Sequence, residues 1–366
     1  MDFRFNEEQD ALRGLAREIF ENEVTPERLK AVEASGEGVD DELWSRLGEA
    51  NLLGLAIPEN QGGMGMGFIE LCLLLHEMGR AVAPVPLLPA LVGAALPLAQ
   101  FGSPSQQDRW LSPLAKGEIF LSASASDGPA LKATPRGEGF VLSGLCRSVP
   151  AVHRAKRLLL PAADGDEEFL ALVDPEATGL DASRSLTSRK EPVFDLQLEG
   201  VALGTEDVLR GPEIMGWVHQ HCLVATAATQ VGVSERALEI TTAYLGEREQ
   251  FGAPLASLTA VQHRCADAYI ALDAMRWMTW TAAARLSEGR SAAREAWAAK
   301  FWAADAGSRI SNAMQHLHGG IGVDMDYPIH RYFFWSKALE LASGGGTVQL
   351  LELGRDMART GPEEFE

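Results

Sequence analysis

Hydrophobic positions change their spacing twice along the 366 residues of the chain. Residues 7–21 and 41–49 are amphipathic with helical spacing, and residues 67–80 form a strongly apolar stretch of helical length. The Ala-Pro-Val-Pro sequence at residues 83–86 must interrupt a helix, because proline lacks the backbone N–H and crowds the preceding turn. The beginning of the chain is therefore predicted to be helical.

The middle of the chain has a different pattern. Short apolar runs typical of strands are separated by glycine, aspartate and proline turns, at residues 120–123, 139–142, 157–160 and 169–173. Helical spacing returns after Gly211, where two sets of mostly apolar residues recur every seven positions: Val224, Val231, Leu238 and Leu245, then Cys265, Leu272, Thr279 and Leu286. Such repeats predict long helices packed in a bundle.

These patterns together predict a mainly α protein with a middle β-domain. A chain of 366 residues exceeds the roughly 250–300 residues that a single core supports. We expect an N-terminal helical domain at residues 1–115, a β-domain at residues 116–210 and a C-terminal helical bundle at residues 211–366.

Charge and targeting signals narrow the classes of function. A net charge of -19 would repel nucleic acid or an anionic membrane, so neither is an expected partner. The N-terminus lacks the basic and apolar regions of a signal peptide, and no uncharged apolar run reaches about 18 residues. We therefore expect a cytoplasmic protein without a membrane span. The four cysteines have no metal-ligand spacing and are expected to be buried thiols.

Two motifs in the last third of the chain carry the candidate chemistry. The first is Glu-Arg-Glu-Gln-Phe-Gly-Ala-Pro-Leu at residues 247–255, followed by Ala-Val-Gln-His at residues 260–263. The second is Gln-His-Leu-His-Gly-Gly-Ile-Gly-Val-Asp at residues 315–324, followed by Tyr-Pro-Ile-His-Arg-Tyr at residues 327–332. Both resemble the C-terminal half of the acyl-CoA dehydrogenases, and residues 53–65 resemble the N-terminal helical domain of that family.

The resemblance implies an architecture and a chemistry. The expected order is an N-terminal helical domain, a small β-barrel or sandwich and a C-terminal four-helix bundle. The expected cofactor is FAD, the expected substrate is an acyl-CoA, and the expected electron acceptor is electron-transfer flavoprotein.

The resemblance assigns flavin contacts to the first motif. In the family, the arginine and phenylalanine at the positions of Arg248 and Phe251 lie at a dimer interface and reach a flavin bound mainly to the neighbouring subunit. A guanidinium suits a pyrophosphate because it forms bidentate hydrogen bonds, and an aromatic ring packs on a flat cofactor. Taken alone, the two residues would more often be a solvated arginine and a core phenylalanine. The matching neighbours favour the cofactor role.

The second motif offers backbone groups. Gly319 and Gly320 let N–H groups approach a phosphate or adenosine closely, although a lone Gly-Gly pair is usually a turn or a helix cap. Gln315 and His316 are further candidates for cofactor contact, and His316 stands where the family generally has glutamine. No carboxylate or cysteine completes a metal set with the nearby histidines, so no metal is expected.

The β-region departs from the family where related enzymes hold the isoalloxazine ring. The corresponding stretches are Ser-Ala-Ser-Ala-Ser-Asp-Gly at residues 122–128 and Cys-Arg-Ser-Val-Pro at residues 146–150, and the aromatic wall is missing from them. A flavin ring in the β-domain of this chain is therefore expected to have poor support.

The family's catalytic base is missing as well. Acyl-CoA dehydrogenation needs a carboxylate to remove the α-proton while hydride passes to the flavin. Related enzymes place this glutamate at one of two positions. One lies just before a Gly-Thr pair and aligns with Gly345, and the other lies on the first bundle helix and aligns with Cys222 and Leu223. Glu340, about two turns before the glycine run, is the remaining candidate for a catalytic residue, with a structural helix carboxylate as the favoured alternative.

This combination resembles one member of the paired-subunit, heterotetrameric acyl-CoA dehydrogenases of the actinobacterial type that acts on CoA thioesters of steroid side chains. There, one subunit supplies the glutamate and the ring pocket, and a homologous partner supplies the arginine and the glycine loop. We therefore expect an enzyme subunit without a catalytic residue of its own. Two alternatives stay open: a self-sufficient homotetrameric acyl-CoA dehydrogenase, and a flavin-free scaffold or acyl-CoA-binding module.

Overall fold

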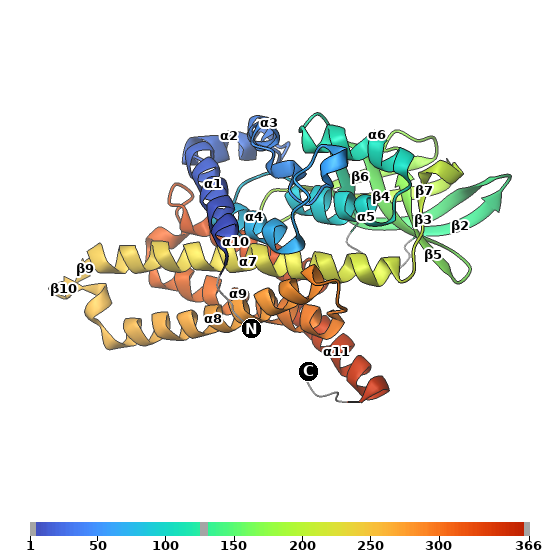
Figure 1. The fold of residues 1–366 in the computed structure, drawn as a ribbon. Helices are drawn as coiled ribbons and strands as arrows, with labels where there is room; N and C mark the ends of the chain where they lie inside the picture. Colours follow the sequence, from blue (N-terminus) through green and yellow to red (C-terminus); the bar gives the residue numbers. More distant parts are fainter. Residues whose placement is uncertain (1–4, 125–130, 362–366) are drawn as a thin grey trace. The chain divides into compact units, whose positions relative to one another are not determined.

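The structure is a computed structural model that describes residues 5–124 and 131–361. Its internal contacts divide the chain into two compact units. The helical unit contains residues 1–26, 72–83 and 223–366, and the β-rich unit contains residues 27–71 and 84–222. The predicted class, mainly α with a middle β-domain, is confirmed (Figure 1). The three predicted domain boundaries stay a prediction.

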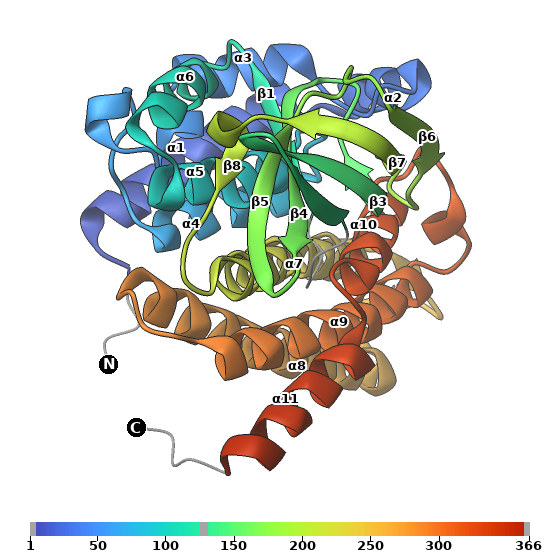
Figure 2. The same cartoon turned by 90° about the vertical axis from the view of Figure 1, so that its right-hand side faces the viewer.

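The β-rich unit is built on a twisted sheet with the strand order β6-β7-β3-β2-β4-β5-β8, and β1 also pairs with β4 (Figure 2). The strands are β1 (Phe120–Ala123), β2 (Leu131–Arg136), β3 (Gly139–Pro150), β4 (Ala155–Asp164), β5 (Glu167–Val173), β6 (Leu180–Leu186), β7 (Pro192–Leu203) and β8 (Val208–Leu209). Strands β1 and β2 run parallel to β4, and the other pairings are antiparallel. The four strands expected from the apolar runs are all present.

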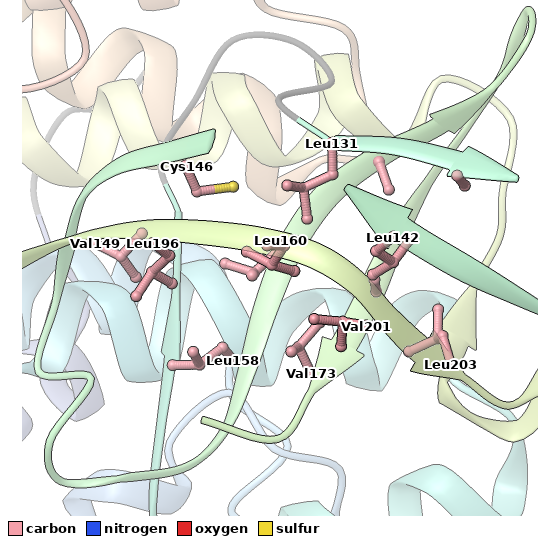
Figure 3. Close-up of a cluster of buried hydrophobic side chains, with 14 of the residues drawn as sticks. Leu131, Leu142, Cys146, Val149, Leu158, Leu160, Val173, Leu196, Val201 and Leu203 are labelled. Carbon is pink, nitrogen blue, oxygen red and sulfur yellow. The ribbon is translucent and has the colours of Figure 1, made fainter. Parts of the chain in front are cut away.

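The apolar positions of these strands meet in one core (Figure 3). Leu142, Leu158 and Leu196 come from three different strands and are fully buried. Cys146 lies in the same core, where burial raises the pKa of its thiol to about 12. The thiol is thus an apolar filler, because reactive cysteines need a lowered pKa.

Short helices accompany this sheet in the β-rich unit. They are α2 (Pro26–Ser35), α3 (Asp41–Glu49), the π-helix η3 (Leu88–Ala95), α5 (Leu96–Phe101) and α6 (Pro104–Ala115). Of these, η3 and α5 contact the strands of the sheet. Trp44 of α3 stacks on Phe120 of β1 with ring centroids 4.3 Å apart, and its indole N–H donates to Gly117 O at 3.1 Å. Gln106 of α6 donates to Val208 O at 3.2 Å, so side chains from two helices fix the helical layer to strand ends.

Long helices make up the helical unit (Figure 1). They are α1 (Glu7–Glu23), α8 (Thr259–Ser287), α9 (Ala293–Leu317), α10 (Ile329–Leu341) and α11 (Gly346–Thr360), together with α4 (Phe68–Ala81) from Cys72 onward and α7 (Ile214–Glu247) from Leu223 onward. Helix α9 packs against α8, α10 and α11. The residues spaced by seven in α7 are buried, as expected for a bundle. Across the described residues, no helix has both the length and the apolar character that a membrane span requires.

Helices α4 and α7 cross at unusually close range because each has a glycine at the crossing. A Cβ at Gly79 would lie 2.2 Å from Thr229 O, and a Cβ at Gly232 would lie 2.0 Å from His76 O. Neither position accepts a side chain without moving the opposing backbone. The glycines therefore bring the charged side chains of the two helices within hydrogen-bonding distance of each other.

The central residue of this crossing is His76, whose ring is 4% exposed. Its Nδ1 lies 3.1 Å from Glu77 Oε1, and its Nε2 lies 2.9 Å from Glu235 Oε2. A neutral imidazole has one N–H donor only, so both contacts are hydrogen bonds when the ring is an imidazolium.

Arginines from three helices complete the cluster. Arg17 of α1 donates two hydrogen bonds of 2.9 Å to Glu77, and Arg80 of α4 donates two of 2.8 Å to Glu239 of α7. Arg276 of α8 lies 3.6 Å from Glu235. These ion pairs connect α1, α4, α7 and α8 through charges that have partners on more than one helix.

The pKa shifts agree with a charged ring. Burial opposes the charge on His76, but the hydrogen bonds to Glu235 and Glu77 outweigh it and raise the pKa. Burial likewise opposes ionisation of the two carboxylates, but the hydrogen bond from His76, together with Arg17 at Glu77 and Arg80 at Glu235, lowers each pKa to about 2.

We predict that the stability of the protein falls as the pH rises through the folded-state pKa of His76. The charged ring is favoured by the fold, so its contribution is complete below the unfolded pKa of about 6.5 and is lost above the raised folded value. His76→Gln should be less stable at pH 6 and should lose this slope, measured by urea unfolding between pH 6 and 9.

His221→Gln is the matched control for this experiment. His221 is also buried, but burial lowers its pKa to about 4, so it stays neutral across this range. The wild-type slope should persist in His221→Gln. An equal slope in His76→Gln and the wild type would show that His76 is not the titrating group.

Candidate functional site

A tight hairpin follows α7 and presents the first motif (Figure 1). Strands β9 (Glu249–Gln250) and β10 (Ala253–Pro254) pair antiparallel around a two-residue turn. The turn residues Phe251 and Gly252 have φ of 55° and 79°, the left-handed values of a type I′ turn. A phenylalanine rarely adopts this conformation, so the turn holds its ring in a position that costs backbone energy.

The hairpin directs its ring and its cation away from the rest of the chain. The Phe251 side chain is 91% exposed, which excludes a core role within this chain. Arg248 is exposed too, and no described carboxylate pairs with its guanidinium. Its backbone N–H donates to Tyr244 O at 2.8 Å, so the residue continues from the last turn of α7.

The second motif forms the end of α9 and the 3-10 turn η6 (Gly319–Val323). Gly319 has φ of 61°, and no atom lies within 4 Å of a Cβ placed on Gly319 or Gly320. Both glycines are exposed. The open space beside their backbone fits a phosphate or a nucleoside approaching from outside the chain.

The structure distinguishes the two polar candidates before this loop. The Gln315 amide nitrogen donates to Gly322 O, which commits it to the shape of the loop. His316 is exposed and stands on the outside of α9. The predicted contacts therefore fall into two groups, Arg248 and Phe251 on the hairpin, and Gln315, His316, Gly319 and Gly320 at the end of α9 and in the loop that follows. Their role in holding a cofactor stays a prediction.

The region that aligns with the family's base is a turn between α10 and α11. Ser343 and Gly344 have φ of 54° and 84°, whereas Gly345 has an ordinary extended conformation. The nearest atom to a Cβ on Gly345 is Glu340 O at 4.0 Å. The backbone would therefore accept a side chain at Gly345, and the missing carboxylate is not a steric requirement of this turn.

A buried lysine holds the turn in place. Lys300 of α9 is fully buried, and its amine donates to Glu340 O at 3.0 Å and to Gly344 O at 3.1 Å. Burial lowers the pKa of Lys300 to about 8, although the nearby Glu340 opposes this. Two backbone acceptors of α10 and the turn are thus satisfied by one side chain from α9, an interaction that no pattern in the sequence indicated.

Glu340, the remaining candidate carboxylate, and Cys222 and Leu223, at the second position for the base, all have contacts typical of structural residues. Glu340 forms an ion pair of 2.7 Å with Lys337, one turn earlier on the same helix. Cys222, on the first bundle helix, is 1% exposed, and burial raises its pKa to about 12. Leu223 beside it is fully buried. Neither family position for the base carries an acid here.

The described part of the predicted ring-binding stretches is divided: Ser122 and Cys146 are buried, whereas Arg147 and Ser148 are exposed. The Ser122 hydroxyl donates to Pro150 O, and Cys146 is fully buried in the sheet core. Ser148 donates its N–H to Asp195 at 2.9 Å. Residues 125–128 of the first stretch lie outside the described residues. No group of histidines, cysteines and carboxylates in residues 5–124 and 131–361 is arranged to hold a metal ion.

Comparison with known proteins identifies this set of features. The family model "Acyl-CoA dehydrogenase, N-terminal domain" matches residues 6–118, and "Acyl-CoA dehydrogenase, C-terminal domain" matches residues 211–358. The chain belongs to the acyl-CoA dehydrogenase family. The resemblance to this family that the motifs showed is confirmed, and with it the expected cofactor, FAD.

Relatives of full length support this assignment. Acyl-CoA dehydrogenase FadE27 of Mycobacterium tuberculosis is 35% identical over 98% of this chain and 100% of its own length. A variant of the Tcur3481-Tcur3483 steroid acyl-CoA dehydrogenase has a TM-score of 0.93 and 42% identity, covering 98% of this chain and 99% of its own. The ChsE4-ChsE5 complex of M. tuberculosis has a TM-score of 0.95 and 35% identity, covering 98% and 100%.

The turn at the empty base position of this acyl-CoA dehydrogenase can be tested by two adjacent substitutions. Gly344→Ala should destabilise the protein by about 1–2 kcal/mol, because it requires a left-handed conformation. Its Cβ would also lie 3.0 Å from Val348. Gly345→Ala should change stability by less than about 1 kcal/mol, because the gain from a stiffer unfolded chain is offset by the poorer N-cap of α11. Urea unfolding measures both, and equal destabilisation by the two variants would contradict this geometry.

Proposed function

We propose that this chain is one subunit of a hetero-oligomeric, FAD-dependent acyl-CoA dehydrogenase, in which a homologous partner subunit supplies the catalytic glutamate. In this arrangement, the chain contributes Arg248, Phe251 and the Gly319-Gly320 loop to a flavin held mainly by the partner. The reaction is α,β-dehydrogenation of a CoA thioester, with a steroid side chain as the acyl group and electron-transfer flavoprotein as the acceptor.

The observation that carries the proposal is a contrast within one chain. The hairpin exposes an arginine and a phenylalanine, of which the ring is 91% accessible and the cation has no partner among the described residues. Both positions for the base, in contrast, hold groups that cannot remove a proton, Gly345 and the buried pair Cys222 and Leu223. Cofactor contacts kept without a base are what a division of labour between two subunits requires.

The relatives support the proposed assembly and substrate class. Two of the similar structures carry names of paired chains, ChsE4-ChsE5 and Tcur3481-Tcur3483, and the second is named a steroid acyl-CoA dehydrogenase. Each covers at least 98% of this chain at 35% identity or more. The same pairing and the same class of CoA thioester are therefore the first to test here.

The alternative of a self-sufficient homotetrameric enzyme requires Glu340, or an acid that the motifs do not indicate, as the base. The carboxylate of Glu340 is paired with Lys337, and its backbone carbonyl accepts a hydrogen bond from Lys300, so the residue already has two roles in the helix end. The flavin-free scaffold has no need for an exposed arginine beside an open glycine loop. Both alternatives are less consistent with the geometry than the paired subunit.

The flavin content of the chain, alone and with its partner, tests the proposal. The chain expressed alone should retain little FAD, and the complex purified from the native host should contain it in stoichiometric amount. In the complex, Arg248→Glu should lower FAD affinity by about tenfold or more, because a hydrogen bond to a charged group contributes about 1.5–3 kcal/mol. Flavin absorbance per complex and FAD titration of the apo-complex give these values.

Arg290→Glu is the matched control, since it makes the same charge change at an exposed arginine paired only with Glu288 among the described residues. Its complex should bind FAD as the wild type does. Fully loaded protein from the single chain, or FAD binding unaffected by Arg248→Glu, would exclude the proposed division.

Substitution of Glu340 tests where the base is located. If the partner supplies it, Glu340→Gln should leave kcat of the complex within about threefold, because an amide keeps the shape of the side chain and a partly exposed ion pair contributes only about 1 kcal/mol. Loss of a true base would lower kcat by about 10² to 10⁴. Lys337→Gln breaks the same ion pair and keeps the carboxylate. A collapse of kcat in Glu340→Gln alone, with FAD still bound, would place the active site in this chain.

A further inference from the structure

His318, directly before the glycine pair, is the least expected residue of the second motif. It is 2% exposed, although the glycines that follow it are fully open. Its Nδ1 lies 2.9 Å from Met314 O, one turn earlier on α9. A carbonyl can only accept, so Nδ1 carries the proton. Burial lowers the pKa of His318, against that hydrogen bond, which makes the ring neutral near pH 7.

The ring is enclosed by two tyrosines from other parts of the chain. Tyr244, in the last turn of α7, stacks on it with centroids 4.6 Å apart and planes 22° apart. Tyr327, just before α10, lies 5.1 Å away at 53°. The tyrosines contact each other edge to face at 6.2 Å. The three rings form one aromatic cluster within the helical unit, which we call the His318 clamp.

The clamp connects the two motifs physically. Tyr244 is followed after four residues by Arg248, whose backbone N–H donates to Tyr244 O at 2.8 Å. On the other side, His318 caps α9 and begins the turn that contains Gly319 and Gly320. The stacked pair therefore sets the separation between the last turn of α7, from which the hairpin starts, and the glycine loop.

Two further contacts hold the loop in its shape from the side of α9. The Gln315 amide donates to Gly322 O. A Cβ on Gly322 would lie 2.8 Å from Gln315 O and 3.2 Å from His318 Cβ, so this glycine is required for the close packing of the loop on the helix end. The loop is thus packed on its inner side and open on its outer side.

We propose that His318 is a positioning residue for FAD binding, which acts through its stack on Tyr244 and not through contact with the flavin. The inference rests on the proposed function, because it takes the hairpin and the loop as the two contacts with one cofactor. A ligand that spans two separate segments binds tightly when the segments are already held at the correct distance, and any looseness between them lowers affinity.

Three variants of His318 and its stacking partner test this in the assembled complex. His318→Ala removes the ring and should raise the dissociation constant of FAD by about tenfold, the effect of losing about 1.4 kcal/mol. His318→Phe keeps a stacking ring and should stay within about threefold of the wild type. Tyr244→Leu should resemble His318→Ala, because it removes the other face of the stack.

A second measurement follows the loop itself. In His318→Ala, the amides of residues 319–323 should exchange with deuterium faster in the apo-complex, because the loop has lost its inner support. In His318→Phe, their exchange should stay near that of the wild type. This readout does not require FAD, and it remains available if a variant binds the cofactor poorly.

His221 offers a matched control for general loss of stability. It is also buried, its Nδ1 is bonded to the carbonyl one turn earlier, Trp217 O at 2.7 Å, and it lies close to the Trp217 ring at 3.9 Å. His221→Ala should therefore lower the melting temperature to a similar extent. Its FAD dissociation constant should stay unchanged, since His221 belongs to the β-rich unit.

Several outcomes would overturn the inference. They are an unchanged dissociation constant in His318→Ala, an equal rise in His221→Ala, or a rise in His318→Phe as large as that in His318→Ala. The result for Arg248→Glu separates this failure from that of the proposed function. If Arg248→Glu releases FAD and His318→Ala does not, only the clamp is wrong; if neither affects FAD, the proposed interface is wrong.

Discussion

The His76 ring lies between Glu77 and Glu235 and can donate to both carboxylates only as an imidazolium. Buried ions are tolerated when their partners are close and correctly oriented, and removing one partner leaves an uncompensated charge. Here the close approach comes from Gly79 and Gly232, which let α4 and α7 cross without intervening side chains. The position of α7, and of the hairpin that follows it, therefore depends on the His76 ion pairs and on the two glycines.

Helix α7 extends from its crossing with α4 to the hairpin that holds the first motif. Its last turn contributes Tyr244 to the stack on His318, and the hairpin with Arg248 and Phe251 follows directly. The buried half of this arrangement is aromatic and neutral, whereas the exposed half contains a cation, a free ring and open glycine backbone. In the proposed assembly the partner's flavin covers this surface, and the Phe251 ring, now 91% exposed, gains burial energy only when it is covered.

The turn between α10 and α11, where we expect the family's base to be missing, is nevertheless held in a defined shape. Lys300 still fixes the turn through Glu340 O and Gly344 O, and Gly345 keeps an ordinary conformation with room for a side chain. Burying the Lys300 amine costs desolvation energy, which its hydrogen bonds to this turn offset, so the turn is held firmly in one position. In the proposed assembly, that position matters for the partner's flavin and not for proton removal by this chain.

Local constraints are what the sequence by itself determined. Each of these constraints acts over a few residues: the prolines after α4, the seven-residue repeat in α7 and the apolar runs of the sheet. Each predicted its element correctly. The two motifs pointed to the acyl-CoA dehydrogenase family because each is a short continuous stretch whose resemblance can be read without the fold, and the family models confirm the membership. The absence of a base at Gly345 and at Cys222 and Leu223 stays a prediction from the sequence, based on residue type alone.

Contacts between distant segments were decided only by the tertiary structure. His76 and Glu235 are 159 positions apart, and the partners of Lys300 are 40 and 44 positions away. The amide nitrogen of Gln315 donates to Gly322 O in the loop that follows it, and His318 lies at the centre of an aromatic cluster. Residue type fixes what a side chain can donate or accept, but the group that it meets depends on how helices far apart in the chain pack together.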